Sequence, residues 1–147
     1  MPMNANRRAA SAWLWRYQQA LREERCLRER IKAARTRAER CTQALQPVVS
    51  HGSSPGSTIE HALELMEQYQ QQLAEQIIQT ETIRAEIEAA LNTLPDPQRS
   101  AAKARYIDGL PIWRVANRLN ISEVYAKKLL AAGLDTLQTV YSITLFL

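Results

Sequence analysis

The chain has 147 residues, of which only four are glycine and one is phenylalanine, whereas Ala, Leu, Gln, Arg and Glu are abundant. This composition is typical of long helices and argues against sandwiches and barrels, so we expect an all-α protein. The length suits a long helical element followed by one small domain, but not two sizeable cores.

Charge is unevenly distributed along the chain, whose formal net charge is +4 at pH 7. Residues 1–46 hold eleven basic and four acidic residues. Residues 47–94 hold one basic and seven acidic residues, and residues 95–147 hold seven basic and four acidic residues. These counts give net charges of +7, −6 and +3. The basic balance is a weak indication of a nucleic-acid partner.

The first predicted element is a long amphipathic helix from about Ala5 to Leu45, a stretch without Gly or Pro. Its apolar residues recur at steps of three and four, although Glu24, Arg28 and Arg35 interrupt the stripe. The seam is therefore weaker than that of a leucine zipper. The stripe comprises Leu14, Tyr17, Ala20, Leu21, Leu27, Ile31, Ala34, Ala38, Cys41 and Leu45.

A connector and a second long helix follow. Residues 47–57 contain two Pro, two Gly and four Ser, a composition typical of a linker. From Thr58 to Leu94, a heptad-like seam predicts a second helix with coiled-coil character. The seam comprises Ile59, Leu63, Met66, Gln70, Leu73, Ile77, Thr80, Arg84, Ile87, Leu91 and Leu94.

The two long helices are interpreted as a helical hairpin over residues 1–94. A basic helix and an acidic helix of similar length neutralise each other when they fold back antiparallel. The alternative is that each helix pairs with its twin in a dimer, since charge runs are also common on solvated helix faces.

A C-terminal three-helix domain is expected over residues 95–147. Pro95 and Pro97 end the second long helix, because each Pro lacks a backbone donor and disfavours helical geometry in the residue before it. The next helices are expected at 98–108, ended by Gly109, and at 112–119, after Pro111. A third helix starts after Ser122, and an apolar tail follows, whose conformation the sequence leaves open.

Residues 112–130 have the pattern of a helix-turn-helix. Ala116 is small enough for two short helices to cross closely, and Asn120 tolerates the positive φ that the turn needs. Ser122 can cap the third helix, and Glu123 suits its positive N-terminal dipole. The residues expected in the shared core are Val115, Leu119, Ile121, Ala126, Leu129 and Leu134.

The stretch YIDGLPIWRVANRLNISEVYAKKLLAAGL, from Tyr106 to Leu134, resembles the sigma-factor region 4-like domain of phage-encoded transcriptional regulators of the RinA and ArpU type. The detailed match covers about the last third of the chain. The resemblance implies binding to double-stranded, promoter-type DNA and control of phage or prophage late genes. The residues that it places on DNA are Arg114, Arg118, Ser122, Glu123, Val124, Tyr125, Lys127 and Lys128.

This sequence departs from the family pattern at three positions. Asn120 replaces the usual Gly, Ala126 replaces a bulkier branched residue, and Gly133 stands where the family has Ala. Basic residues that commonly continue the recognition face are also missing. Weak binding by one copy is therefore expected, which favours a homodimer on two half-sites.

No enzyme, metal or cofactor is expected. The sequence has no Gly-rich phosphate loop, no catalytic triad pattern and no Cys/His cluster with metal-ligand spacing, and a small-molecule substrate is not expected. Cys26 and Cys41 are too far apart along one helix to form a disulfide within one chain. No signal peptide or membrane span is expected, so we place the protein in the bacterial cytoplasm.

Two alternatives to the regulator remain open. A phage small terminase subunit also combines a helix-turn-helix with a coiled coil and binds viral DNA for packaging, but there the DNA-binding unit usually comes first. The other alternative is a coiled-coil adaptor whose terminal domain binds RNA polymerase or another protein.

Trp13, Trp15 and Trp113 are interpreted as helix-interface anchors rather than as platforms for nucleic acid.

Overall fold

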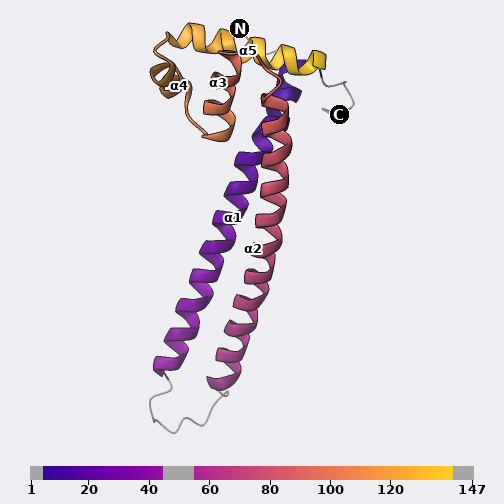
Figure 1. Ribbon diagram of the computed structural model, residues 1–147. Coiled ribbons are helices and arrows are strands. Elements are labelled where there is room, and N and C mark those ends of the chain that lie inside the picture. Colours follow the sequence, from indigo (N-terminus) through magenta and orange to yellow (C-terminus); the bar gives the residue numbers. More distant parts are fainter. Residues whose placement is uncertain (1–4, 45–54, 141–147) are drawn as a thin grey trace. The chain divides into compact units, whose positions relative to one another are not determined.

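The computed structural model describes residues 5–44 and 55–140, and every regular element in these two ranges is a helix (Figure 1). The all-α prediction is confirmed. The two long helices are α1 (Ala5–Ala44) and α2 (Pro55–Leu91). The shorter elements are α3 (Gln98–Ala102), the π-helix η1 (Lys103–Ile107), α4 (Ile112–Leu119) and α5 (Glu123–Val140).

The chain divides into two compact units. Unit 1 comprises Met1–Ala20 and Thr80–Leu147, and unit 2 comprises Leu21–Gln79. Both long helices contribute to both units. The first turns of α1 and the end of α2 therefore pack together with the residues in which the C-terminal domain was expected.

In unit 1, α1 and α2 pack antiparallel. Arg16 forms an ion pair with Glu86 at 2.9 Å, and the Arg84 guanidinium lies 5.7 Å from the centre of the Tyr17 ring. In these two contacts the residue number rises along α1, from 16 to 17, and falls along α2, from 86 to 84, as in an antiparallel pair. The expected hairpin arrangement is thus present in this unit.

The apolar stripe predicted for α1 is largely buried. Leu14 is fully inaccessible, and Tyr17, Ala20, Leu27, Ile31, Ala34 and Ala38 are buried as well, whereas Leu21 and Cys41 are half-buried. The steps of three and four were sufficient to identify this face. Leu45, the last residue of the predicted stripe, lies outside the described residues.

The seam predicted for α2 is correct in unit 1 and at every second position in unit 2. Thr80, Ile87, Leu91 and Leu94 are buried, but Leu63, Gln70 and Ile77 are exposed. Of the other predicted seam residues in unit 2, Ile59, Met66 and Leu73 are half-buried. Beside the three exposed positions, the preceding residue is buried or half-buried instead, namely Ala62, Tyr69 and Gln76. The apolar band on α2 is wider than one seam, so its spacing could not decide which edge faces α1.

The connector predicted at 47–57 is described only in part. Residues 47–54 lie outside the described residues, and α2 begins at Pro55 rather than at Thr58. Pro is compatible with the first turn of a helix, where its missing backbone donor costs nothing.

Unit 1 holds most of the core. The largest side chains with essentially no exposure are Leu14, Thr80, Ile87, Leu91, Leu94, Val115 and Leu137, and all seven lie in this unit. After α2 ends at Leu91, the chain turns through Pro95 and Pro97 into α3 and then η1. Gly109 follows with φ of +70°, as its predicted role at the helix end requires.

The last helix, α5, continues through Gly133 to Val140. Gly133 is buried against the turn after α2 and against α3, since a Cβ built there would lie 3.5 Å from Leu94 Cδ1 and 3.9 Å from Gln98 Cβ. The first part of the predicted apolar tail is therefore helical. Residues 141–147 lie outside the described residues.

Candidate nucleic-acid interface

The turn between α4 and α5 has the geometry that the sequence predicts. Asn120 adopts left-handed φ and ψ of 55° and 45°, a region that Asn tolerates better than most residues. The Ser122 Oγ accepts a hydrogen bond from the backbone N–H of Tyr125 at 3.1 Å. The predicted cap on α5 is confirmed, and the cap fixes the start of this helix.

The two helices pack through the expected core. Val115, Ala126, Leu129 and Leu134 are buried, and Leu119 and Ile121 are half-buried. Ala116, the small residue expected where the two helices cross, is buried as well. This core fixes which faces of α4 and α5 point outward.

All eight residues predicted to bind DNA are exposed. Five of them lie in the first two turns of α5, and Val124 and Tyr125 there are 63% and 47% exposed. Val124 and Lys128 are one helical turn apart and project from the same face. The start of α5 thus combines apolar, aromatic and cationic groups on one accessible surface.

The α4 residues Arg114 and Arg118 differ in their surroundings. The Arg118 guanidinium forms an ion pair with Asp108, although about half of each side chain is accessible. The Arg114 guanidinium lies 5.9 Å from the centre of the Trp113 ring. Trp113 itself is 55% exposed, so within one chain it does not anchor a helix interface as expected.

Ion pairing leaves the start of α5 basic. Residues 95–140 contain four acidic residues, and three of them form ion pairs: Asp96 with Arg99, Asp108 with Arg118, and Asp135 with Arg7. Lys127 and Lys128 form no ion pair with any described residue. Their charges are therefore available to an anionic partner, and only the Glu123 carboxylate nearby opposes such a partner.

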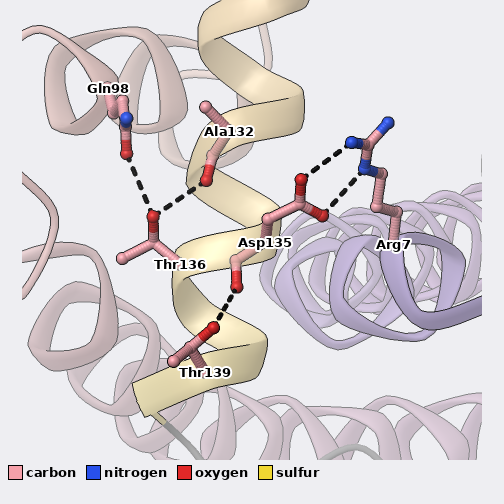
Figure 2. Close-up of polar contacts among 6 residues, drawn as sticks. All are labelled: Arg7, Gln98, Ala132, Asp135, Thr136 and Thr139. Carbon is pink, nitrogen blue, oxygen red and sulfur yellow. Dashed lines mark hydrogen bonds and ion pairs between the residues drawn. The ribbon is translucent and has the colours of Figure 1, made fainter.

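The beginning of α1 contacts α5, the helix that carries most of these exposed residues. Arg7 forms a two-point ion pair with Asp135, with bonds of 2.8 and 2.7 Å (Figure 2). On the same helix α5, Thr136 Oγ1 donates to the Ala132 carbonyl at 2.9 Å, and the Thr139 hydroxyl donates to the Asp135 carbonyl. The ion pair joins the second half of α5 to α1, whereas the two threonine bonds lie within α5.

Further contacts join α1 to η1. The Gln18 side-chain amide donates to the Ile107 carbonyl at 2.7 Å, and the Ser11 hydroxyl lies 3.0 Å from that of Tyr106. Trp15 meets the Tyr106 ring edge to face at 5.1 Å between centroids. The interface interpretation thus holds for Trp15.

Sequence reasoning missed most of this support. Gln18 lies at the edge of a helical stripe, where a polar residue is expected to face solvent, and no spacing rule links it to Ile107. The π-helical turn was missed as well. In η1 the Asp108 amide donates to the Lys103 carbonyl at 3.0 Å, five residues back. One sequence feature did indicate a contact here: Trp15 is a large aromatic residue beside the α1 stripe, where it needs another segment to pack against.

No group of three or more His, Cys, Asp or Glu side chains among the described residues could hold a metal ion. No helix in the described ranges is long and apolar enough to cross a membrane.

Comparisons with protein families, with curated proteins and with solved structures found no match to this chain.

Proposed function

We propose that this protein is a sequence-specific DNA-binding regulator of phage or prophage late genes, of the RinA and ArpU type, acting in the bacterial cytoplasm. The observation that supports the proposal most directly is the exposed start of α5, where Val124, Tyr125, Lys127 and Lys128 project from a capped helix. An α-helix is about 10–12 Å wide, and the major groove of DNA is about 12 Å wide.

Each of these side chains has a chemical role in the proposed DNA complex. Lys127 and Lys128 can donate to guanine edges or to phosphates, and Val124 can contact a thymine methyl group. Tyr125 can donate to a phosphate, and the Glu123 carboxylate can accept a hydrogen bond from cytosine N4. Arg114 and Arg118, on α4, are suited to phosphates at the edge of the groove.

The test is fluorescence anisotropy of the full chain with duplex fragments from its own genomic neighbourhood, at several salt concentrations. We expect one fragment to bind more tightly than the others, with log K falling by about 0.9 per phosphate contact for each unit of log salt. Lys127→Gln/Lys128→Gln should lower both the affinity and this slope. Val124→Ala/Tyr125→Ala should reduce the preference for the tight fragment.

The matched control is Lys32→Gln/Arg37→Gln, which removes two exposed positive charges from α1 in unit 2. This variant should bind the fragments as the unmodified chain does. Equal loss in both charge variants would contradict the α5 assignment, because it would mean that total charge alone determines binding.

The exposure of Trp113 favours a second candidate, an adaptor that binds RNA polymerase or another protein. Aromatic side chains are enriched at protein interfaces, and they are depleted from ordinary solvated surfaces. Absence of binding to every fragment, together with loss of polymerase binding in Trp113→Ala, would favour the adaptor. A ring of many subunits that binds viral DNA would instead favour the small terminase subunit.

A further inference from the structure

The end of η1 is capped by a side chain from another helix. The last carbonyls of a helix have no donor within the helix and need one from elsewhere. Here the side-chain amide of Gln18, on α1, donates to the Ile107 carbonyl at 2.7 Å and to the Tyr106 carbonyl at 3.3 Å. The two hydrogens of one amide group therefore serve two carbonyls. We call this pair of bonds the Gln18 cap.

The backbone after η1 makes room for this cap and does not replace it. The Leu110 amide donates back to the Ala104 carbonyl at 3.1 Å, and Pro111 has no backbone donor. Gly109 has φ of +70°, and a Cβ built on it would lie 2.9 Å from Gln18 Oε1. A residue without a side chain thus suits both the turn and the close approach of the Gln18 amide.

A second link to α1 holds the other end of the same turn. The Arg105 guanidinium donates to the Leu110 carbonyl at 2.9 Å, and it lies 4.8 Å from the centre of the Trp15 ring. Trp15 and Gln18 are three positions apart, so they project from neighbouring places on α1. One turn of α1 therefore contacts residues 107–110 at both ends, directly through Gln18 and through Arg105.

The turn between η1 and α4 has few anchors of its own. Asp108, Gly109 and Pro111 are exposed, and Ile107 and Leu110 are only half-buried. A segment with few buried apolar contacts opens easily unless other interactions hold it. The hydrogen bonds from Gln18 and from Arg105 therefore contribute much of what fixes the path of this turn.

The first turn of α4 starts directly from this segment. The amides of Arg114 and Val115 donate to the Pro111 carbonyl at 3.0 and 3.1 Å. Val115 is the first fully buried residue of α4, whereas Trp113 and Arg114 are exposed. The position of Arg114 therefore depends on Pro111 and on the turn before it, rather than on burial of its own side chain.

We propose that Gln18 is a positioning residue for DNA binding, although it lies on α1 and outside the helix-turn-helix. Its cap on η1 holds the turn that leads into α4, and so keeps Arg114 where the guanidinium reaches a phosphate. Gln18 acts through Arg114 and makes no contact with DNA of its own. The inference rests on the proposed function, because Arg114 meets a phosphate only if the protein binds DNA.

The first experiment measures DNA binding of Gln18→Met by fluorescence anisotropy at several salt concentrations. Methionine keeps the length of the side chain but has no donor. The slope of log K against log salt should fall by about 0.9, which corresponds to one lost phosphate contact. The preference among fragments should remain, because the start of α5 is unchanged. The matched control is Gln19→Met, the same change at an exposed neighbour, which should bind as the unmodified chain does.

The salt slope separates positioning from a loss of stability. A partly unfolded population lowers the apparent affinity in proportion to its fraction, but it does not change the number of phosphate contacts in the complex. Arg114→Gln should lower the slope by the same amount as Gln18→Met. The double variant Gln18→Met/Arg114→Gln should lower it no further, because both changes remove the same contact.

The second experiment requires no DNA. Hydrogen exchange of the full chain measures the protection of the Arg114 and Val115 amides, which close the first turn of α4. In Gln18→Met this protection should fall, while the protection of the Leu134 amide, in the buried part of α5, should stay the same. Gln19→Met should change neither.

Three results would overturn the proposal. They are an unchanged salt slope in Gln18→Met, a further fall of the slope in the double variant, and unchanged exchange at the start of α4. If the unmodified chain binds no fragment, the proposed function fails instead. Hydrogen exchange then still decides whether Gln18 positions the start of α4.

Discussion

The hydroxyl of Ser11, on α1, lies 3.0 Å from the hydroxyl of Tyr106, on η1, and both side chains are buried. The contact joins residues 95 positions apart in the sequence. A buried hydroxyl that loses its partner pays a desolvation cost, so the two groups depend on each other.

We expect Tyr106→Phe and Ser11→Ala each to lower the free energy of unfolding by about 1–3 kcal/mol. The double variant should lose less than the sum of the two single losses, because neither hydroxyl is then left buried alone. Urea unfolding of the four proteins measures this coupling. Strictly additive losses would mean that the hydroxyl contact contributes nothing.

Tyr106 should also make the protein sensitive to alkali. Burial raises the pKa of its phenol, and the Ser11 hydrogen bond and the Arg105 charge only partly oppose this effect. The folded state therefore favours the neutral phenol. The resulting stability is fully present below the unfolded pKa of about 10 and is lost as the pH rises through the folded pKa. Urea midpoints should fall in this range, and less steeply in Tyr106→Phe.

The ion pair of Arg7 with Asp135 predicts the opposite dependence at acid pH. The hydrogen bond from Arg7 is the main cause that lowers the pKa of the Asp135 carboxyl. Its stabilising effect is present above the unfolded pKa of about 3.9 and is lost as the pH falls through the folded pKa. Asp135→Asn should make the free energy of unfolding depend less on pH in this range. Added salt should weaken the effect, since both side chains are partly exposed.

Two glycine substitutions should have opposite effects. Gly133→Ala should stabilise the protein by about 1 kcal/mol, because α5 is helical there and the new Cβ would make an ordinary contact with Leu94. Gly109→Ala should destabilise it by at least about 1–2 kcal/mol, since φ is +70° and the new Cβ would lie 2.9 Å from Gln18 Oε1. Chemical unfolding of both variants measures whether the free energy of unfolding rises or falls.

Asp108 should limit DNA binding through its ion pair with Arg118. If α5 binds the major groove, Asp108→Asn frees the Arg118 guanidinium for a phosphate and removes a negative charge. Affinity should rise for every fragment, and the salt slope should increase by about 0.9. Asp108→Asn/Arg118→Gln should lose this gain in the same anisotropy assay. An unchanged affinity in Asp108→Asn would show that Arg118 lies away from the phosphates.

The parts of the fold governed by local chemistry were predictable from sequence. Asn120 in the turn and Ser122 at the cap follow from backbone rules that act within a few residues. The contacts of Ser11 and Gln18 join distant segments, and no local rule identifies such partners. The wrong positions in the α2 seam, Leu63, Gln70 and Ile77, were unpredictable for another reason: the apolar band of this helix is wider than one seam, and packing against α1 selects the edge that is buried.

The pairing of the start of α1 with the end of α5 also constrains the order of folding during synthesis. Arg7 is translated 128 residues before Asp135, so the contact between them cannot form until nearly the whole described chain has left the ribosome. Unit 2 comprises Leu21–Gln79, so all of its residues are translated before Asp135. The last helix made then completes the packing of the first one.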